Sequence, residues 1–281
     1  MSSLGSATVS FIGAGAMAEA MIAGVLNRQL IKPEQVHASH PRADRRQELQ
    51  TRYGINVHHM NLEAAQAGDI VVLTIKPQIL KRVIPELRGN LRADQLVLSI
   101  IAGAPIHALA TGLLHPAIAR AMPNTPAQIG QGMTVWTTTH EVHHDQKAQV
   151  KELLGALGKE IWVEDEQMVD MATALSGTGP TYVFMVMEAL IDAGVHLGFS
   201  RRVATELVEQ TMLGSVMFAL ETRKHPAELR NMVTSPGGTS AEAIYQMEKG
   251  ALRTVLSKAV YAAFLRTQTL SESVSKNIDK E

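Results

Sequence analysis

The sequence contains no cysteine among its 281 residues, which excludes disulfides and thiolate metal sites and fits a reducing compartment. Basic and acidic side chains number 26 and 27, so the net charge of −1 creates no general attraction to nucleic acid or to an anionic membrane. The longest apolar runs, such as "DIVVLTI" and "LVLSIIAGA", are too short to cross a bilayer. The first residues lack the basic region of a signal peptide. We therefore expect a soluble, cytoplasmic protein with no nucleic-acid or membrane partner.

The first part of the chain alternates short β-branched runs with amphipathic stretches. The length of the whole chain, and the 46% of its residues that are hydrophobic, suit two domains better than one. The strand-like runs cover residues 8–13, 35–39, 55–58, 69–75, 96–101, 118–122, 132–138 and 160–164. Such alternation predicts an α/β domain with a largely parallel sheet, covered on both faces, over residues 1–164.

After Asp165 the sequence is helical in period. The helical stretches cover residues 165–175, 181–198, 201–222, 225–233 and 240–270. Several of them are apolar nearly all round and rich in methionine and alanine, which indicates burial against a partner as well as against neighbouring helices. We expect residues 165–281 to form an all-α second domain.

A dinucleotide fingerprint of the form G-x-G-x-x-A lies in "VSFIGAGAMAEAMIAG", with Gly13, Gly15 and Ala18 at the three marked positions. A strand precedes it and an amphipathic helix follows. Gly13 permits the tight turn, Gly15 lets the backbone approach a pyrophosphate, and Ala18 lets the helix pack closely on the sheet. A glycine-rich turn without a ligand is the alternative, which the βα context disfavours.

The turn after the second strand indicates which dinucleotide is bound. An NAD site usually has an acidic residue there for the ribose 2′-hydroxyl, whereas this chain has Ser39, His40 and Arg42 in "SHPR". Hydroxyl, imidazole and guanidinium groups suit a 2′-phosphate, so we predict NADPH, with NADH possible as an alternative. Arg45 and Arg46 are expected on a solvated helix face.

Polar residues and prolines follow three further strands. Lys76 and Pro77 end one strand, Ala102 follows the next, and Asn124 follows the third. Ligands of open α/β sheets bind at the carboxyl ends of the strands, so these residues are further candidates for the cofactor site.

"HEVHH", residues 140–144, matches the letters of a zinc-protease motif. That motif requires both histidines on one face of a formed helix, whereas here the helix is expected to start near Asp145. His140 then lies in a loop, and we predict no metal site.

The stretch "SPGGTSAE", residues 235–242, combines a proline, two glycines and two hydroxyls before a helix. Thr239 and Glu242 have the spacing of a capping box. Glycines that leave backbone N–H groups open at a helix start make a carboxylate receptor. Ser240 beside it offers a hydroxyl to a ring nitrogen or carbonyl. A simple helix cap is the alternative.

Together, "FIGAGAMA", "IKPQ", "AMPNTPA", "LSGTGPTY" and "SPGGTS" resemble the pyrroline-5-carboxylate reductase family over essentially the whole chain. The resemblance implies an N-terminal Rossmann domain, an α-helical dimerisation domain, a homodimer and often a pentamer of dimers. It implies reduction of the cyclic imine 1-pyrroline-5-carboxylate to L-proline, the last step of proline biosynthesis. It also implies that the substrate loop comes from the partner subunit.

Pattern and resemblance together give the expected site residues. Those around the cofactor are Ile12, Gly13, Ala14, Gly15, Ala16, Met17, Ala18, Ser39, His40, Arg42, Asn61, Ile75, Lys76, Pro77, Ala102 and Asn124. Those around the substrate are Glu166, Ser235, Gly237, Gly238, Thr239 and Ser240, with Ser240 as the catalytic residue. Glu166 could equally cap the first C-terminal helix. The family usually has threonine where this chain has Ser240.

Two other functions fit parts of the pattern. A β-hydroxyacid dehydrogenase of the 6-phosphogluconate type shares the domain plan but needs a lysine early in the helical region, and "SGTGPTYVFMVMEALIDAG" has none. A regulatory dinucleotide-binding protein without turnover explains the fingerprint but not the "SPGGTS" loop.

Overall fold

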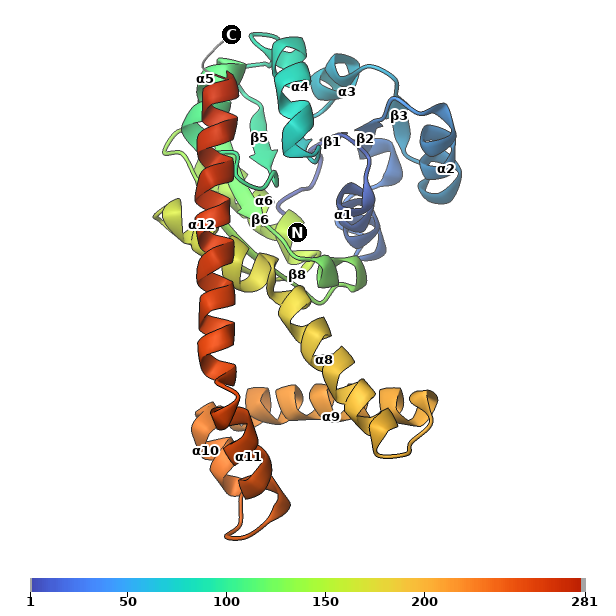
Figure 1. Ribbon diagram of the computed structural model, residues 1–281. Coiled ribbons are helices and arrows are strands. Elements are labelled where there is room, and N and C mark those ends of the chain that lie inside the picture. The colour runs from blue at the N-terminus through green and yellow to red at the C-terminus, as the bar shows by residue number, and fades with distance from the viewer. Residues whose placement is uncertain (1, 279–281) are drawn as a thin grey trace. The chain divides into compact units, whose positions relative to one another are not determined.

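A computed structural model describes residues 2–278, and within them eight strands form one sheet in the order β3-β2-β1-β4-β5-β6-β7-β8 (Figure 1). The strands are β1 Val9–Ile12, β2 Val36–Ser39, β3 Asn56–His58, β4 Ile70–Leu73, β5 Leu96–Ser99, β6 Ile118–Met122, β7 Gly132–Thr138 and β8 Gly158–Trp162. All neighbours are parallel except β6 and β7. The largely parallel sheet predicted from the sequence is confirmed, and each predicted run contains or overlaps a strand.

Helices cover both faces of this sheet. They are α1 Ala16–Asn27, α2 Ala43–Tyr53, α3 Asn61–Ala67, α4 Leu80–Leu87, α5 Ile106–Leu113 and α6 His144–Gly155. One buried layer joins alternate strand residues such as Phe11 to α1, α2 and α6, and the other joins residues such as Val71 to α3, α4 and α5. Val274 and Ile278, at the end of the chain's last helix, belong to the second layer. The two layers arise because both faces of a parallel sheet are apolar.

The register of the central strands places three loops together. Ile12 at the end of β1 pairs with Ser39 of β2 and with Leu73 of β4. The residues that follow these three positions therefore leave the sheet together at the carboxyl ends of the strands, where the strand order changes direction at β1. Open α/β sheets bind ligands at such a switch point.

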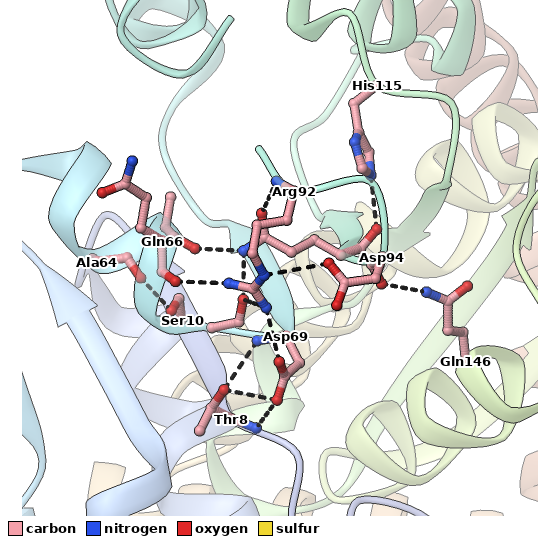
Figure 2. A network of polar contacts seen from close by, with 12 residues as sticks. Thr8, Ser10, Ala64, Gln66, Asp69, Arg92, Asp94, His115 and Gln146 are labelled. Carbon is pink, nitrogen blue, oxygen red and sulfur yellow. Dashed lines mark hydrogen bonds and ion pairs between the residues drawn. The ribbon is translucent and has the colours of Figure 1, made fainter. Parts of the chain in front are cut away.

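At the amino ends of the central strands, a polar network joins the loops that lead into them (Figure 2). The Arg92 guanidinium donates to the Gln66 carbonyl at 2.7 Å and contacts Asp69 Oδ1 at 2.9 Å. Asp69 Oδ2 accepts hydrogen bonds from the backbone N–H and hydroxyl of Thr8, each at 2.9 Å. The network joins the amino ends of β1 and β4 to the loop before β5. The carboxyl ends of these strands, which the network does not involve, are free to form a site.

The later part of the chain is helical, as predicted. The helices are α7 Gln167–Ala172, α8 Gly179–His196, α9 Arg201–Thr222, α10 Pro226–Met232, α11 Thr239–Lys249 and α12 Leu252–Ile278, with one π-helical segment, Thr173–Gly177. Among the described residues, no helix has both the length and the apolar character needed to cross a membrane.

The helical stretch expected over residues 240–270 is interrupted, which corrects that prediction. Gly250 caps α11, and Ala251 has φ of 56°, in the left-handed region. Gly250 N–H donates to the Gln246 carbonyl and Ala251 N–H to the Glu248 carbonyl, each at 2.9 Å, so the last turn closes on itself. A new helix then starts at Leu252.

The chain divides into two compact units, residues 1–179 with 262–281, and residues 180–261. The domain division at residues 164 and 165 follows the change of secondary-structure class, and it stays a prediction. All residues from 180 to 261 are described, and Ala204 is the only one of them that is buried. The second unit therefore has almost no core of its own.

Candidate functional site

The two fingerprint glycines have different reasons to be glycine. Gly13 has φ of +92°, and a Cβ atom there would lie 2.6 Å from Ile75 Cγ2. Gly15 has an ordinary φ of −78°, and a Cβ atom there would meet nothing within 4 Å. The chain's own packing thus requires Gly13 but not Gly15. The open space above Gly15 fits a ligand that approaches the backbone.

Helix α1 begins at this turn with open donors. Gly15 is its N-cap and supplies no side chain, and the N–H groups of Ala16 and Met17 have no acceptor within the described part of the chain. Ile12 and Ala18, on either side of the turn in sequence, are fully buried and anchor it to the core. The arrangement fits a dinucleotide pyrophosphate, which helix N-termini bind through backbone N–H groups and the helix dipole.

Ser39 orders the turn from the end of β2. Its side chain is buried, its Oγ accepts from Gly13 N–H at 3.4 Å, and it donates to Asn61 Oδ1 at 2.7 Å. The amide nitrogen of Asn61 donates in turn to Glu86 Oε2 at 2.6 Å. A chain of hydrogen bonds thus runs from the glycine-rich turn through Ser39 and Asn61 to α4. Because Ser39 is buried, its contacts position other groups.

The arginines after β2 are already engaged. Arg42 forms an exposed ion pair with Asp44, and the hydrogen bond from Arg42 lowers the pKa of Asp44 to about 2. Arg45 donates to the Ala14 carbonyl at 3.0 Å and pairs with Glu19.

Arg46 donates to the carbonyls of His40 and Pro41 at 2.6 and 2.9 Å. Arg45 and Arg46 are partly buried, so the expectation that they lie on a solvated helix face is wrong. Both hold loops of this edge in place, because a guanidinium can satisfy several carbonyl or carboxylate oxygens at once.

These loops enclose a cleft of 780 Å³. The cleft residues expected from the sequence are Gly13, Ala14, Gly15, His40, Asn61, Ile75 and Lys76, and Pro41 of the "SHPR" turn lies beside them. Those that sequence reasoning missed are His59, Met60, Leu62, Thr74, Ile79, Arg82, Val83 and Glu86. Most of the missed residues come from the start of α3 or from α4 and the turn before it. The i, i+4 spacing of Arg82 and Glu86 puts both residues on one face of α4, but it does not indicate that this face lines the cleft.

His40 lines the cleft as a neutral ring. Burial lowers its pKa below the ordinary value of 6.5, and the charges of Arg42 and Arg45 act in the same direction. The Nδ1 atom accepts the backbone N–H of Arg42 at 3.2 Å. At pH 7 the ring therefore contributes a hydrogen-bonding group to the cleft and little charge.

Several expected cofactor residues do not line this cleft: Ile12, Ala16, Met17, Ala18, Ser39, Arg42, Pro77, Ala102 and Asn124. Pro77 starts the short 3₁₀ turn before α4, and Ala102 is half-buried in the turn after β5. The Asn124 side chain joins two segments, because its Oδ1 accepts from Met133 N–H at 2.9 Å and its nitrogen donates to the Ser176 carbonyl at 3.1 Å. Contact with a cofactor stays a prediction for these residues.

The "SPGG" segment is a tight turn with the features of type II. Gly238 N–H donates to the Ser235 carbonyl at 3.0 Å, and Gly237 between them has φ of +70°. A Cβ atom on Gly238 would lie 2.5 Å from Ser235 Oγ. Type II turns place proline second and a left-handed glycine third. Turn geometry and close packing therefore explain both glycines without a ligand.

The capping box predicted for Thr239 and Glu242 is wrong. Gly238 is the N-cap of α11, and its carbonyl accepts the N–H groups of Ala241 and Glu242 at 3.1 and 3.3 Å. Thr239 is already inside the helix, so its hydroxyl cannot cap it. In the described part of the chain, the N–H groups and hydroxyls of Thr239 and Ser240 have no hydrogen-bond partner. The turn thus presents an uncapped helix start with two adjacent hydroxyls.

Glu166 has a supporting role that the sequence did not indicate. Its Oε1 accepts from the Arg120 guanidinium at 2.6 Å and from Ile106 N–H at 2.8 Å. Arg120 is 2% exposed and also pairs with Asp170. The Glu166 side chain therefore caps α5. Glu166 also stands at the N-cap position of α7, the first C-terminal helix, but its side chain makes no cap hydrogen bond there. Its contact with a substrate stays a prediction.

The cleft and Glu166 belong to the first compact unit, and Ser235–Ser240 belong to the second. In "HEVHH", α6 begins only at His144, and His140 lies in the turn before it, as predicted. Among the described residues, no three histidine, aspartate or glutamate side chains are grouped closely enough to hold a metal ion.

Comparison with known proteins links the chain to one family. Residues 166–270 match the family described as pyrroline-5-carboxylate reductase dimerisation, and residues 8–103 match that described as NADP oxidoreductase, coenzyme F420-dependent. A pyrroline-5-carboxylate reductase from Pseudomonas aeruginosa is 40% identical over 95% of this chain and 98% of its own length.

Solved structures give the same result. The pyrroline-5-carboxylate reductase from Coxiella burnetii is 36% identical with a TM-score of 0.88, covering 95% of this chain and 99% of its own. The Plasmodium falciparum pyrroline carboxylate reductase, solved with NADP bound, is 31% identical with a TM-score of 0.86, covering 94% of this chain and 98% of its own. The chain thus belongs to the pyrroline-5-carboxylate reductase family.

Proposed function

We propose that this chain reduces 1-pyrroline-5-carboxylate to L-proline, with NADPH as the reductant and NADH as an alternative. Identity of 40% to a reductase of that name over nearly the whole of both chains carries the proposal. The open space above Gly15 and the open N–H groups at the start of α1 support a dinucleotide in the cleft. When bound, the reduced nicotinamide supplies the hydride.

The turn before α11 is proposed to bind the substrate. Gly237, Thr239 and Ser240 have backbone N–H groups with no acceptor in the described residues, and the dipole of α11 adds to their attraction for a carboxylate. The hydrogen-bonded turn geometry supports the role as well, because a receptor whose backbone is already in its binding conformation loses little freedom on binding. The carboxylate docked here orients the imine carbon toward the hydride donor.

Ser240 is proposed to hold the imine nitrogen. Hydride adds to the imine carbon, the π electrons of the C=N bond move to nitrogen, and the nitrogen carries or receives one proton. The Ser240 hydroxyl hydrogen-bonds that nitrogen and fixes its direction. An iminium is already a good hydride acceptor, so orientation supplies much of the rate. Serine keeps the donor of the family's threonine but lacks the methyl group that restricts its rotamers.

An assay that follows both NADPH oxidation and proline formation tests the proposal. We expect Ser240→Ala to lower kcat/KM about tenfold to a thousandfold, the scale of one oriented donor. Ser240→Thr serves as the matched variant and should keep most of the activity. Wild-type kcat/KM in Ser240→Ala contradicts the role of the hydroxyl. Absence of proline with either nucleotide contradicts the function itself.

Assembly and location complete the proposal. A homodimer is supported by the match of residues 166–270 to the dimerisation family. A pentamer of dimers, a substrate loop contributed by the partner, and a cytoplasmic location are further parts of it. Native mass spectrometry and cell fractionation test them.

A further inference from the structure

The arginines next to the expected 2′-phosphate position are poorly placed to bind it. Arg42 does not line the cleft and is paired with Asp44. Arg45 and Arg46 are engaged by Glu19 and by backbone carbonyls. A phosphate that used these groups would have to displace existing partners.

Arg82 differs from all of these. It comes from the first turn of α4, lines the cleft and is exposed. Within the described residues, its guanidinium has no hydrogen bond or ion pair, even though Glu86 lies one turn further along the same helix. A guanidinium has five donors in a planar fork that matches phosphate oxygens, so an unpartnered one in a nucleotide cleft is a candidate phosphate ligand.

Hydrogen bonds connect the Arg82 face of α4 to the end of β2. Residues four apart lie on one helix face, so Arg82 and Glu86 share a face. Glu86 Oε2 accepts from Asn61 at 2.6 Å, and Asn61 Oδ1 accepts from Ser39 at 2.7 Å. In this fold the end of the second strand marks the adenosine ribose. Arg82 therefore borders the ribose part of the cleft.

Among the described residues, Lys76 is the other cationic side chain that lines the cleft without a partner. It borders a different part of the cleft from Arg82. It follows Ile75, whose Cγ2 approaches the glycine-rich turn at Gly13. That position is beside the pyrophosphate-binding turn, which NADPH and NADH both occupy. The two cations therefore face different phosphates.

We propose that Arg82 is a specificity-determining residue, which binds the 2′-phosphate of NADPH from the α4 wall of the cleft. This inference rests on the dinucleotide site of the proposed function and adds to it the group that distinguishes the two nucleotides. Glu86 on the same face carries the opposite charge and weakens the attraction for phosphate. The preference for NADPH then depends on α4 as well as on the "SHPR" turn.

Binding titrations on the full-length protein test the proposal with four probes: NADPH, NADH, 2′,5′-ADP and 5′-AMP. We expect Arg82→Ala to weaken NADPH and 2′,5′-ADP about tenfold to a hundredfold, as for loss of a charged hydrogen bond. NADH and 5′-AMP should change less than about threefold, since they lack the phosphate in question. Arg82→Lys should fall between, because it keeps the charge but loses the fork.

Two neighbouring lysines give matched comparisons. Lys81 lies next to Arg82 on α4 but lines a separate groove with Val274 and Ile278, so Lys81→Ala should leave all four affinities within about twofold. Lys76→Ala should weaken NADPH and NADH alike. Glu86→Gln should strengthen NADPH binding relative to NADH, because it removes a negative charge beside the phosphate.

Three results overturn the proposal: unchanged NADPH affinity in Arg82→Ala, equal losses for NADPH and NADH, or an equal loss in Lys81→Ala. Failure of the proposed function has a different signature. If the wild-type protein binds the nucleotides but forms no proline, the function fails while the role of Arg82 is still decided by the titrations. If it binds neither nucleotide, the site itself is absent and both proposals fall.

Discussion

At the scale of single residues, the two fingerprint glycines can be separated by experiment. Gly15→Ala should change the free energy of unfolding by about 1 kcal/mol or less, because φ at residue 15 suits alanine and the added Cβ meets no protein atom. The same change should weaken dinucleotide binding at least tenfold, since the Cβ occupies the space expected for the pyrophosphate. Thermal unfolding and NADPH titration measure the two effects.

Gly13→Ala should behave in the opposite way. The strained φ and the 2.6 Å approach to Ile75 Cγ2 act on the folded chain itself, so stability falls before any ligand is added. If the two variants lost stability equally, the distinction between a structural and a ligand-facing glycine would be wrong.

A second prediction at this scale concerns His37 and pH. Burial lowers the pKa of His37, and the neighbouring His58 adds to the effect; His37 Nδ1 and His58 Nε2 lie 3.0 Å apart. Below pH 6.5 the unfolded chain protonates this histidine more readily than the folded chain, so stability is present above that pH and is lost as pH falls. Unfolding curves measured between pH 8 and 5 should show that His37→Gln loses less stability on acidification than the wild type does.

His144→Gln provides the control for this titration, because the side chain of His144 is 97% exposed. Its pH profile should match the wild type. An unchanged profile in His37→Gln as well would assign the acid sensitivity to other groups.

The sequence identified site residues whose role follows from the local backbone conformation. It missed site residues whose role follows from how separate elements pack against one another. Gly13 and Gly15 follow from a strand–turn–helix pattern that is readable over ten residues. Arg82 and Glu86 reach the cleft only because α4 packs beside α3, and no local pattern gives that contact. For the same reason Arg45 looked solvated, although its partner Glu19 is distant in sequence.

At the scale of elements, a buried ion triad fastens α7 to β6. Arg120 is 2% exposed and bonds Glu166 and Asp170, whose side chains are 32% and 16% exposed. Arg120→Met should cost about 3–5 kcal/mol of unfolding free energy, because it leaves two partly buried carboxylates without a cationic partner. Chemical denaturation measures the loss, and adding Glu166→Gln and Asp170→Asn should restore part of it. No recovery in the triple variant would argue that Arg120 acts through its packing alone.

Element types were readable from the sequence where composition and period agree. The β-branched runs became strands because both faces of the sheet are buried. The break between α11 and α12 was missed because one glycine is tolerated in a helical pattern, and the left-handed Ala251 has no sequence signal. Turn geometry likewise moved the N-cap of α11 to Gly238, one residue before the predicted capping box.

At the scale of the whole molecule, the second compact unit needs a partner to be stable. Among residues 180–261 Ala204 alone is buried, while Phe184, Met185 and Leu213 are 59%, 65% and 56% exposed. Burial of apolar area is the main favourable term in folding, so helices that bury so little within the unit draw stability from another surface. The match of residues 166–270 to the dimerisation family supports a second copy of the chain as the source of that surface.

Charges on the exposed apolar face of α9 should therefore disrupt assembly. Leu213→Glu combined with Val216→Glu replaces two residues that are 56% and 59% exposed in the single chain, so the change costs little unless a partner covers them. We expect sedimentation to show monomers, with lower helical content and lost activity, whereas Gln50→Glu on α2 should leave the assembly intact. For the wild type, the melting temperature should rise with protein concentration, because association stabilises the folded state by mass action. A wild-type protein that sediments as a fully helical, active monomer would contradict this account.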